Sequence, residues 1–527
     1  MTGDPQDPGG KPSSLLKSTG VVSSMTLISR VLGFVREILF AAQLGMGAAM
    51  DVFFVAFRIP NLFRRLFAEG AFTQAFVPVF TEARAQRSPE EVQRLVELVA
   101  GTLAGFLACI TALAVLGAPW VMLAFAPGFI DDPAKFEQGV ELLRWTFPYL
   151  LFISLTALAG GVLNAYGKFA ATAFNPVWLN VCLIGAALFV GTVEALAIAV
   201  LAAGIVQLAF LLPGIARLGL LSRPRWGWSD PQVRKIMRLM VPIMIGSSAS
   251  QFSLILDTIV ASFLPGDGNV AWLWYADRLM EFPLGTFSVA IATVLLPSLA
   301  RAHVRPDAGA SFRATLDWGL RLVLLIGLPA MLGLLLLAGP MVSTIYQHGV
   351  VTPRDVTMTS WALAAYAVGF LGFSLVKVLV TGFYARQETR APLRYAFIAF
   401  GAGMACTLAF TALALATEFL APHAAIALAT STGALVNAAL LFRRLRRDGA
   451  YVPAAGWGRF AMQLLLANAA LAAVLVALHG DLAQWTAAPV VERVTRLSVA
   501  IGGAAAAYFA ALLASGVRLR HFRQSGA

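Results

Sequence analysis

Charged residues are scarce in this chain. Only 13% of its 527 residues are Asp, Glu, Lys or Arg, whereas 59% are hydrophobic; a typical soluble domain carries about 25% charged residues. Apolar runs long enough to cross a bilayer recur along the sequence, and the mean hydropathy is +0.78. This composition excludes a soluble globular protein. The period-two alternation of transmembrane barrels is missing as well, so the sequence predicts an all-α, polytopic membrane protein.

Cysteine and histidine are also few. The three cysteines, Cys109, Cys182 and Cys406, fall in apolar runs without metal-ligand spacing, and the five histidines are scattered. No phosphate-binding Walker loop is present. These absences argue against a metal site, a disulfide-bonded scaffold and an ATP-driven machine. Nothing in the chain indicates an enzyme, and no cofactor is predicted.

Positive charge exceeds negative charge, with 39 Lys and Arg against 27 Asp and Glu and a formal net charge of +12. In a soluble protein this excess would suggest nucleic acid. Here the basic residues gather in alternate loops, as expected of loops facing the cytoplasm, so both termini are predicted to be cytoplasmic and no nucleic-acid partner is expected. Residues 1–13 are predicted to be a disordered cytoplasmic tail rather than a signal peptide. Arg493 and Arg496 are the main exceptions to the loop pattern.

About fourteen transmembrane helices are predicted. Several exceed the roughly 20 residues that a bilayer requires, so tilts or breaks are expected, with Gly33 and Pro60 as candidate break points. The predicted spans lie near residues 14–44, 50–82, 91–117, 137–166, 171–193, 195–217, 232–264, 270–300, 311–338, 355–385, 391–416, 421–443, 457–480 and 491–517.

The chain also repeats itself at an offset of about 220 residues. The segment AFRIPNL matches ADRLMEFP, and GAPWVMLAFAPG resembles AGPMVSTIYQHG. Because each half holds an even number of spans, both halves enter the membrane in the same orientation, which predicts two parallel six-helix repeats. The expected divisions are an N-terminal lobe at 14–220, a C-terminal lobe at 221–447, and two additional helices with a basic cytoplasmic tail at 448–527.

Arginine inside apolar segments is the strongest functional signal. Arg30 and Arg36 lie in the first predicted span, Arg64 in the second and Arg278 in the eighth. A guanidinium stays charged and costs about 3 kcal/mol or more at bilayer depth, so each should face a wet cavity, a partner or an anion. For Arg36, snorkelling and pairing with Glu37 are the alternatives. The planar fork of arginine binds phosphate oxygens in pairs, so the predicted cargo is an anion carrying phosphate.

Arg64 in the second predicted span has polar residues close to it in the sequence. Asn61, Arg64 and Arg65 follow Pro60 at helical spacing, and only one of the two adjacent arginines can face a central ligand. Glu69 lies one turn beyond Arg65 and is a candidate for neutralising it.

Three further carboxylates fall in or beside apolar segments. Glu281 is three residues from Arg278, so an internal salt bridge is an alternative to cargo binding by that arginine. Asp51 opens the second span and is either a helix N-cap or an outer-gate partner for a basic residue. Asp257 is a candidate cation or proton site, and a structural hydrogen bond is the alternative.

Both halves of the chain contain long, specific motifs. They are SSMTLISRVLGFVRE, DVFFVAFRIPNLFRRLFAEGAFTQAFVPVF, WYADRLMEFPLGTFSVAIATVLLPSLAR and GFYARQETRAP. These motifs resemble the MurJ (MviN) family of lipid II flippases. The resemblance covers essentially the whole chain, and Asp257 stands where some relatives have asparagine.

The resemblance implies the fold of the multidrug/oligosaccharidyl-lipid/polysaccharide exporter superfamily. That fold has two six-helix lobes around a central cavity, plus two helices that form a groove for a polyprenyl tail. The implied function is alternating-access transport of undecaprenyl-pyrophosphoryl-MurNAc-pentapeptide-GlcNAc (lipid II) to the outer leaflet of the bacterial inner membrane, for peptidoglycan synthesis. The residues implied to engage the pyrophosphate are Arg30, Arg36, Arg64 and Arg278, with Ser29, Asp51 and Asn61 as further important positions.

Two rival functions stay open at this stage. A flippase for another polyprenyl-linked glycan would share the arginine cavity, and a drug/cation antiporter of the same superfamily would need an acidic one. A non-transporting scaffold leaves the buried charges unexplained. The energy source is expected to be Na⁺, H⁺ or the membrane potential. Membrane lipids and proteins of cell-wall synthesis or division are the other expected partners.

Overall fold

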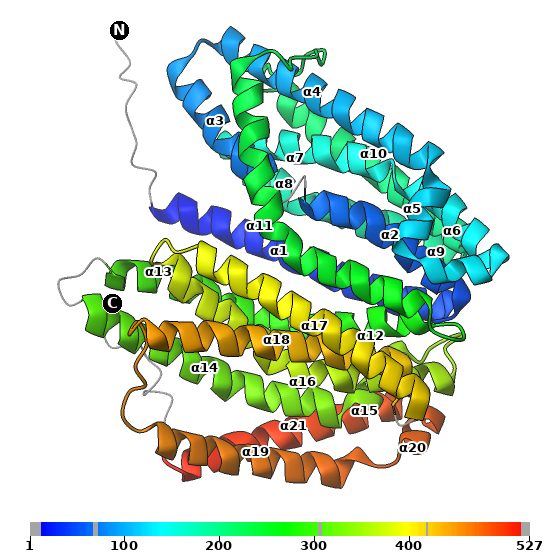
Figure 1. Ribbon diagram of the computed structural model, residues 1–527, viewed down its shortest axis with the longest axis vertical. Coiled ribbons are helices and arrows are strands. Elements are labelled where there is room, and N and C mark those ends of the chain that lie inside the picture. The colour runs from blue at the N-terminus through cyan, green and yellow to red at the C-terminus, as the bar shows by residue number, and fades with distance from the viewer. Residues whose placement is uncertain (1–11, 67–71, 304–307, 418–419, 518–527) are drawn as a thin grey trace. The chain divides into compact units, whose positions relative to one another are not determined.

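The computed structural model describes residues 12–66, 72–303, 308–417 and 420–517 (Figure 1). These residues form helices and connecting loops, and none of them lies in a strand. Eleven of the helical segments among them are long and apolar enough to cross a membrane. The all-α, polytopic fold predicted from the sequence is therefore confirmed. The predicted tails at residues 1–11 and 518–527 lie outside the described residues.

The first, second and seventh predicted spans are not among these eleven segments. They correspond to α1 (Pro12–Leu44), α2 (Ala48–Arg64) and α11 (Pro231–Ser262). α1 runs through Gly33 without interruption, so the predicted break there is wrong. Pro60 lies inside α2, which continues one turn further. A single helical glycine costs only about 1 kcal/mol, too little to end a long helix.

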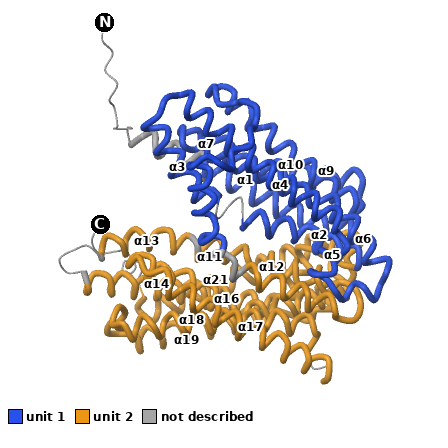
Figure 2. Tube along the Cα trace, turned by 45° about the horizontal axis from the view of Figure 1, so that its top comes forward, with its two compact units in different colours: residues 1–44, 48–248 blue, residues 45–47, 249–527 orange. Residues whose placement is uncertain are grey.

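The chain folds into two compact units, which Figure 2 shows in blue and orange. The first comprises residues 1–44 and 48–248, and the second residues 45–47 and 249–527, so the division falls inside α11. The further helices of the first unit are α3 (Thr73–Gln86), α4 (Pro89–Leu116), α5 (Ala118–Phe125), α6 (Pro133–Thr146), α7 (Tyr149–Ala165), α8 (Phe169–Phe174), α9 (Pro176–Phe189) and α10 (Val193–Ala216).

The second unit includes the two C-terminal spans. Its helices are α12 (Asn269–Pro283), the π-helical turn η3 (Leu284–Ser288), α13 (Val289–His303), α14 (Ala308–Leu336), α15 (Ala338–Tyr346), α16 (Pro353–Tyr384), α17 (Arg390–Thr417), α18 (Pro422–Arg447), α19 (Trp457–His479), α20 (Leu482–Ala487) and α21 (Val490–Ala514).

The duplication seen in the sequence recurs in the helix packing within each unit. In the first unit, α7 packs against α2, α3, α4 and α10; in the second, α16 packs against α12, α13, α14 and α18. The central helix of the first unit is interrupted between Thr146 and Tyr149, where Pro148 intervenes, whereas α16 is continuous. The two parallel repeats therefore share one packing scheme with this local difference.

The last two helices pack onto α14 and α15 of the second unit (Figure 1). Leu464, Leu471 and Leu497 belong to the apolar cluster between α19, α21 and α14. Arg493, an exception to the loop-charge pattern, is only 6% exposed, and its Nη1 donates to the backbone oxygen of Ser343 at 2.6 Å. It therefore serves as an internal hydrogen-bond donor between α21 and α15.

The connection from α18 to α19 is tied to α14 by one carboxylate. Asp317 is 6% exposed, forms an ion pair with Arg321 at 2.8 Å, and accepts hydrogen bonds from the Tyr451 hydroxyl at 2.8 Å and the Trp457 indole at 2.7 Å. Burial and this bond to Asp317 raise the pKa of Tyr451 above its usual range. The backbone N–H of Ala454 also donates to Asp317, at 3.3 Å. Because four donors converge on one buried group, Asp317 positions the start of α19.

We expect Asp317→Ala to lower the free energy of unfolding by about 2–4 kcal/mol, because a mostly buried ion pair and three hydrogen bonds are lost together. Thermal unfolding of the detergent-solubilised protein measures this. Glu82→Ala is the matched control, since the Glu82–Lys235 pair is about half exposed, at 51% and 49%, and should contribute less than about 1 kcal/mol. Equal melting temperatures for both variants would contradict this role of Asp317.

Candidate functional site

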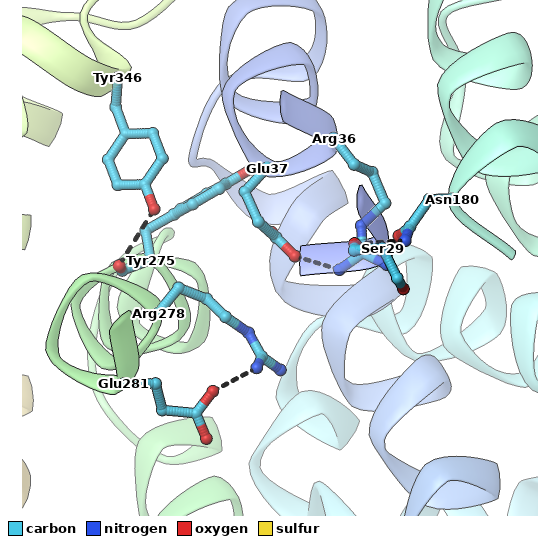
Figure 3. A network of polar contacts seen from close by, with 8 residues as sticks. All are labelled: Ser29, Arg36, Glu37, Asn180, Tyr275, Arg278, Glu281 and Tyr346. Carbon is cyan, nitrogen blue, oxygen red and sulfur yellow. Dashed lines mark hydrogen bonds and ion pairs between the residues drawn. The ribbon is translucent and has the colours of Figure 1, made fainter. Parts of the chain in front are cut away.

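Arg36 lies at the centre of a polar network in the first unit (Figure 3). Its Nη1 donates to Oδ1 of Asn180 at 3.0 Å, and its Nη2 forms an ion pair with Glu37. The Nδ2 of Asn180 donates to the backbone oxygen of Ser29 at 3.0 Å, which ties α9 to α1. The side chains of Arg36 and Glu37 are only 11% and 3% exposed. The ion-pair alternative for Arg36 is therefore realised here, with an amide added to it.

The guanidinium of Arg36 still has hydrogen-bonding capacity. A guanidinium carries five N–H donors, and the buried Nε of Arg36 donates to no described residue. Its Cζ lies 5.7 Å from the centre of the Phe40 ring. Arg36 therefore has more N–H donors than the acceptors around it can satisfy.

Arg30 has a different environment from Arg36. It lies on the exposed side of α1 and forms no hydrogen bond or ion pair within the described part of the chain. Six residues of helix separate the two side chains by about 120° around the axis. The structure therefore leaves Arg30 accessible and buries most of Arg36.

Arg64 ends α2 and is held by the residue one turn before it. Its Nε donates to Oδ1 of Asn61 at 2.9 Å. The predicted neutralising residue Glu69 lies outside the described residues.

A cavity of about 450 Å³ lies inside the first unit, and Arg64 and Ser29 are part of its wall. The other walls come from α3, α7, α8, α9 and α10. Besides Arg64, the polar side chains among its described lining residues are amides and hydroxyls. The amide side chains are Asn164, Asn175, Asn180 and Gln207.

Asp51 is buried in the first unit and paired with a lysine. It is 1% exposed, and its Oδ2 lies 3.1 Å from Nζ of Lys135 on α6. α2 begins at Ala48, so Asp51 lies inside the helix and is not its N-cap. Lys135 Nζ also lies 4.7 Å from the centre of the Phe129 ring. Of the two roles predicted for Asp51, the structure shows the pairing with a basic residue.

Arg278 on α12 is the predicted cargo-binding arginine of the second unit (Figure 3). Its Nη1 lies 2.6 Å from Oε2 of Glu281, and its Cζ lies 4.5 Å from the centre of the Trp274 ring. The side chain of Arg278 is 27% exposed and that of Glu281 is 43% exposed. An ion pair this exposed is weakly held, so the guanidinium can exchange Glu281 for a stronger anion.

Asp257 lies on α11 within the second unit and is 5% exposed. The hydroxyl of Thr430 on α18 donates to its Oδ2 at 2.9 Å. The structural hydrogen bond that the sequence left as an alternative is therefore present.

Several partners of these residues had no signal of their own in the sequence. Asn180 is a single amide in an apolar helix, Lys135 lies in a loop-like stretch, and Thr430 is one hydroxyl among many. Each meets its partner across more than 80 positions of chain. The two amides Asn175 and Asn180 in the otherwise apolar span predicted at 171–193 are the one clue that could have indicated Asn180.

A family model described as the lipid II flippase MurJ matches residues 40–495. A probable lipid II flippase MurJ of Vibrio cholerae is 44% identical over 521 residues, covering 97% of this chain and 98% of the relative. The lipid II flippase MurJ of Burkholderia cenocepacia is 40% identical over 522 residues, covering 97% of this chain and 99% of the relative.

Solved structures with the same fold agree with these relatives. A lipid II flippase MurJ in an inward closed conformation has a TM-score of 0.74 at 21% identity, covering 93% of this chain and 99% of that chain. An inward-facing multidrug resistance transporter of the MATE family has a TM-score of 0.60 at 15% identity, covering 82% of this chain and 98% of that chain. At these identities the likeness shows the fold alone.

Proposed function

Because the chain belongs to the MurJ family of lipid II flippases, we propose that Arg36 and Arg64 of its first unit and Arg278 of its second bind the pyrophosphate of lipid II. The protein is a multi-pass membrane transporter that moves this peptidoglycan precursor across the bacterial inner membrane. The contacts of the three guanidinium groups support the site assignment. Arg36 and Arg64 lie beside amide side chains, and Arg278 lies beside the Trp274 ring. The acids paired with Arg36 and Arg278 are partners that cargo can replace.

The main barrier to moving lipid II is electrostatic. A pyrophosphate loses its hydration in hydrocarbon, at a cost far above what the polyprenyl tail can offset. Guanidinium groups replace that hydration with paired N–H donors of fixed geometry. Arg30, exposed on α1, would meet the cargo first. The tail would stay in lipid along α19 and α21, which expose Leu465 and Val499 at 65% and 57%.

Alternating access provides the route for the head group. The arginines hold the pyrophosphate while the two repeats expose it first to one side of the membrane and then to the other. Asp51, paired with Lys135, supports α2 against α6 in the first unit. Asn61 and Glu281 orient Arg64 and Arg278 until cargo replaces them.

The rival functions have less support. A drug/cation antiporter needs carboxylates facing its substrate, whereas the cavity of the first unit is lined by amides, hydroxyls and Arg64. A flippase for another polyprenyl-linked glycan would use the same arginines. Three relatives that share 40% or more of their residues with this chain are named as lipid II flippases or probable lipid II flippases.

Both termini are proposed to face the cytoplasm, on the basis of the basic residues in alternate loops. Fluorescent proteins that mature only in the cytoplasm, fused to either end, should both fluoresce. A dark fusion at one end would contradict this orientation.

Asp257 is proposed as a site for the coupling ion, either Na⁺ or H⁺, with Thr430 as its neighbour. Asp257→Asn should remove the dependence of lipid II translocation on that ion's gradient, because the charge that titrates or binds the ion is gone. Translocation measured in vesicles with imposed sodium or proton gradients tests this. An unchanged gradient dependence in Asp257→Asn would contradict Asp257 as the site of the coupling ion.

The transport function is tested by depleting the protein in cells that lack a second flippase. Lipid II should accumulate in the inner leaflet and disappear from the outer leaflet, and the wild-type chain should restore it. Normal outer-leaflet lipid II in depleted cells would contradict the function.

A further inference from the structure

The connection between α10 and α11 is fastened to the side of α4 in the first unit. The N–H of Arg225 donates to the backbone oxygen of Glu97 at 3.1 Å. The N–H of Gly227 donates to the Thr102 hydroxyl at 2.9 Å. A Cβ at Gly101 would lie 2.2 Å from the backbone oxygen of Arg225, so only glycine permits this close approach. The connection therefore has a defined place on a helix that is apolar enough to cross the membrane.

Two tryptophans of this connection are exposed, and one of them lies on α4. Trp226 and Trp228 are 63% and 44% exposed, and their ring centres lie 6.4 Å apart. A Cβ at Gly105 would lie 2.8 Å from Cζ3 of Trp226, so this ring covers the apolar helix at Gly105. Tryptophan is enriched where a membrane meets water. The two rings therefore place the connection at the surface of the bilayer.

A pocket of about 390 Å³ lies where this connection enters α11. Its size falls within the range of roughly 300–1,000 Å³ that is typical of ligand sites. Each ionisable residue among its described walls is basic. Arg238 lies one turn beyond both Arg234 and Lys235, so the three side chains share one side of the helix. The described lining residues are Ser229, Pro231, Arg234, Lys235, Arg238 and Leu239.

The cations of this pocket are only partly neutralised. Lys235 pairs with Glu82 on α3 at 3.0 Å, and both side chains are about half exposed. The Nε of Arg234 donates to the backbone oxygen of Trp228 at 3.0 Å, which joins the pocket to the tryptophan-bearing connection. The side chain of Arg238 is exposed and forms no hydrogen bond or ion pair with any residue that the structure describes. The pocket therefore carries an excess of positive charge.

The surface of α11 next to these cations is apolar. Leu239 and Val241 are 42% and 56% exposed and follow Arg238 within one turn. The span predicted from the sequence begins near residue 232, so the cations lie where this helix enters the membrane. A free phosphate would leave the apolar side chains uncovered, whereas a molecule with an anionic head and an apolar tail covers both parts.

A head that carries sugars fits the pocket less well than a small one. Ser229 is the single uncharged polar side chain among its described walls, so a glycan would find few hydrogen-bond partners there. The adjacent acid is already engaged, because Oδ1 of Asp230 accepts the N–H groups of Gln232 and Val233 at 2.8 and 3.3 Å and so caps α11. The chemistry that matches this pocket is therefore a small phosphate headgroup.

We propose that this pocket binds the headgroup of an anionic membrane phospholipid, with the phosphate on Arg234 and Arg238 and an acyl chain along Leu239. The connection belongs to the basic loops that are proposed to face the cytoplasm, and anionic lipids of that leaflet attract basic groups at the membrane surface. The bound lipid ties the start of α11 to the bilayer. It is a ligand that stays in place and not the cargo, so the inference does not depend on the arginines proposed to bind pyrophosphate.

The test is equilibrium binding of radiolabelled dioctanoyl phosphatidylglycerol to the purified full-length protein in neutral detergent. Dioctanoyl phosphatidylcholine, which has the same acyl chains and no net charge, is the comparison lipid. Wild type should bind the anionic lipid about tenfold more tightly than the neutral one. Arg234→Gln with Arg238→Gln should weaken binding of the anionic lipid about tenfold, because two cations that face the phosphate are lost. Binding of the neutral lipid should stay unchanged.

Arg443→Gln with Arg447→Gln on α18 is the matched control. Both side chains are exposed and form no hydrogen bond or ion pair with a described residue, and the loss of formal charge is the same. This control should bind phosphatidylglycerol as wild type does. Leu239→Glu adds a negative charge to the pocket without removing a cation, and it covers the case in which the double arginine variant fails to fold. It should reproduce the selective loss of the anionic lipid.

Equal affinity of wild type for the two lipids, unchanged affinity in the pocket variants, or an equal loss in the control would overturn the site. Two competitors identify the occupant. Displacement of phosphatidylglycerol by an equal concentration of inorganic phosphate would make the pocket a site for free phosphate. Stronger displacement by undecaprenyl pyrophosphate would make it a cargo site, and either result would overturn the proposal. The translocation tests of Arg36 and Arg278 are independent of all these outcomes.

Discussion

Arg36→Ala should reduce lipid II translocation by about 100-fold or more. Two charge-assisted hydrogen bonds to a pyrophosphate contribute about 3–6 kcal/mol, and each 1.4 kcal/mol corresponds to a factor of ten. The loss should be accompanied by destabilisation, because the substitution removes the guanidinium beside Glu37, whose side chain is 3% exposed. Lipid II reaching the outer leaflet is measured in depleted cells that express the variant at the wild-type level.

A double variant separates the cargo role of Arg36 from its structural role. In Arg36→Gln with Glu37→Gln, both charges of the ion pair are gone, so the buried site is neutral and the melting temperature should exceed that of Arg36→Ala. Translocation should stay as low as in the single variant. Recovery of translocation together with stability would mean that Arg36 only holds α1 in place.

Arg278→Ala should reduce translocation by at least tenfold with little effect on stability. The ion pair with Glu281 is substantially exposed, at 27% and 43%, so its loss should cost less than about 1 kcal/mol. Contact with the Trp274 ring adds a cation–π interaction of about 0.5–1 kcal/mol. Translocation in depleted cells and thermal unfolding of the purified variant together measure the two effects.

Glu281→Gln distinguishes the two explanations for Arg278. If the arginine binds cargo, removing its acid should lower translocation far less than removing the arginine, since the guanidinium remains available. If the Arg278–Glu281 pair only stabilises α12, both substitutions should lower translocation equally. Equal losses would remove Arg278 from the cargo site.

The fold could be read from the sequence because hydropathy and repetition are local or periodic signals. The AFRIPNL and ADRLMEFP segments indicated the duplication, and they lie in α2 and α12, which occupy equivalent places in the packing of the two units. Gly33 was misjudged because propensity alone cannot show how well the rest of α1 is packed.

The site could be predicted only in part. Arginine in apolar segments gave Arg36 and Arg64 because charge in hydrocarbon is costly wherever it occurs. Asn180 was missed because its role depends on Arg36, which it meets across 144 positions of chain.

The most direct test of arginine-mediated lipid II transport is the amount of lipid II in the outer leaflet of depleted cells that express a double variant, Arg36→Lys with Arg278→Lys. Lysine retains the charge but loses the bidentate fork that matches phosphate. We predict that wild type restores outer-leaflet lipid II and that the double variant, present at the same level in the membrane, leaves it at the depleted level. Full restoration by the double variant would contradict recognition of pyrophosphate by these arginines.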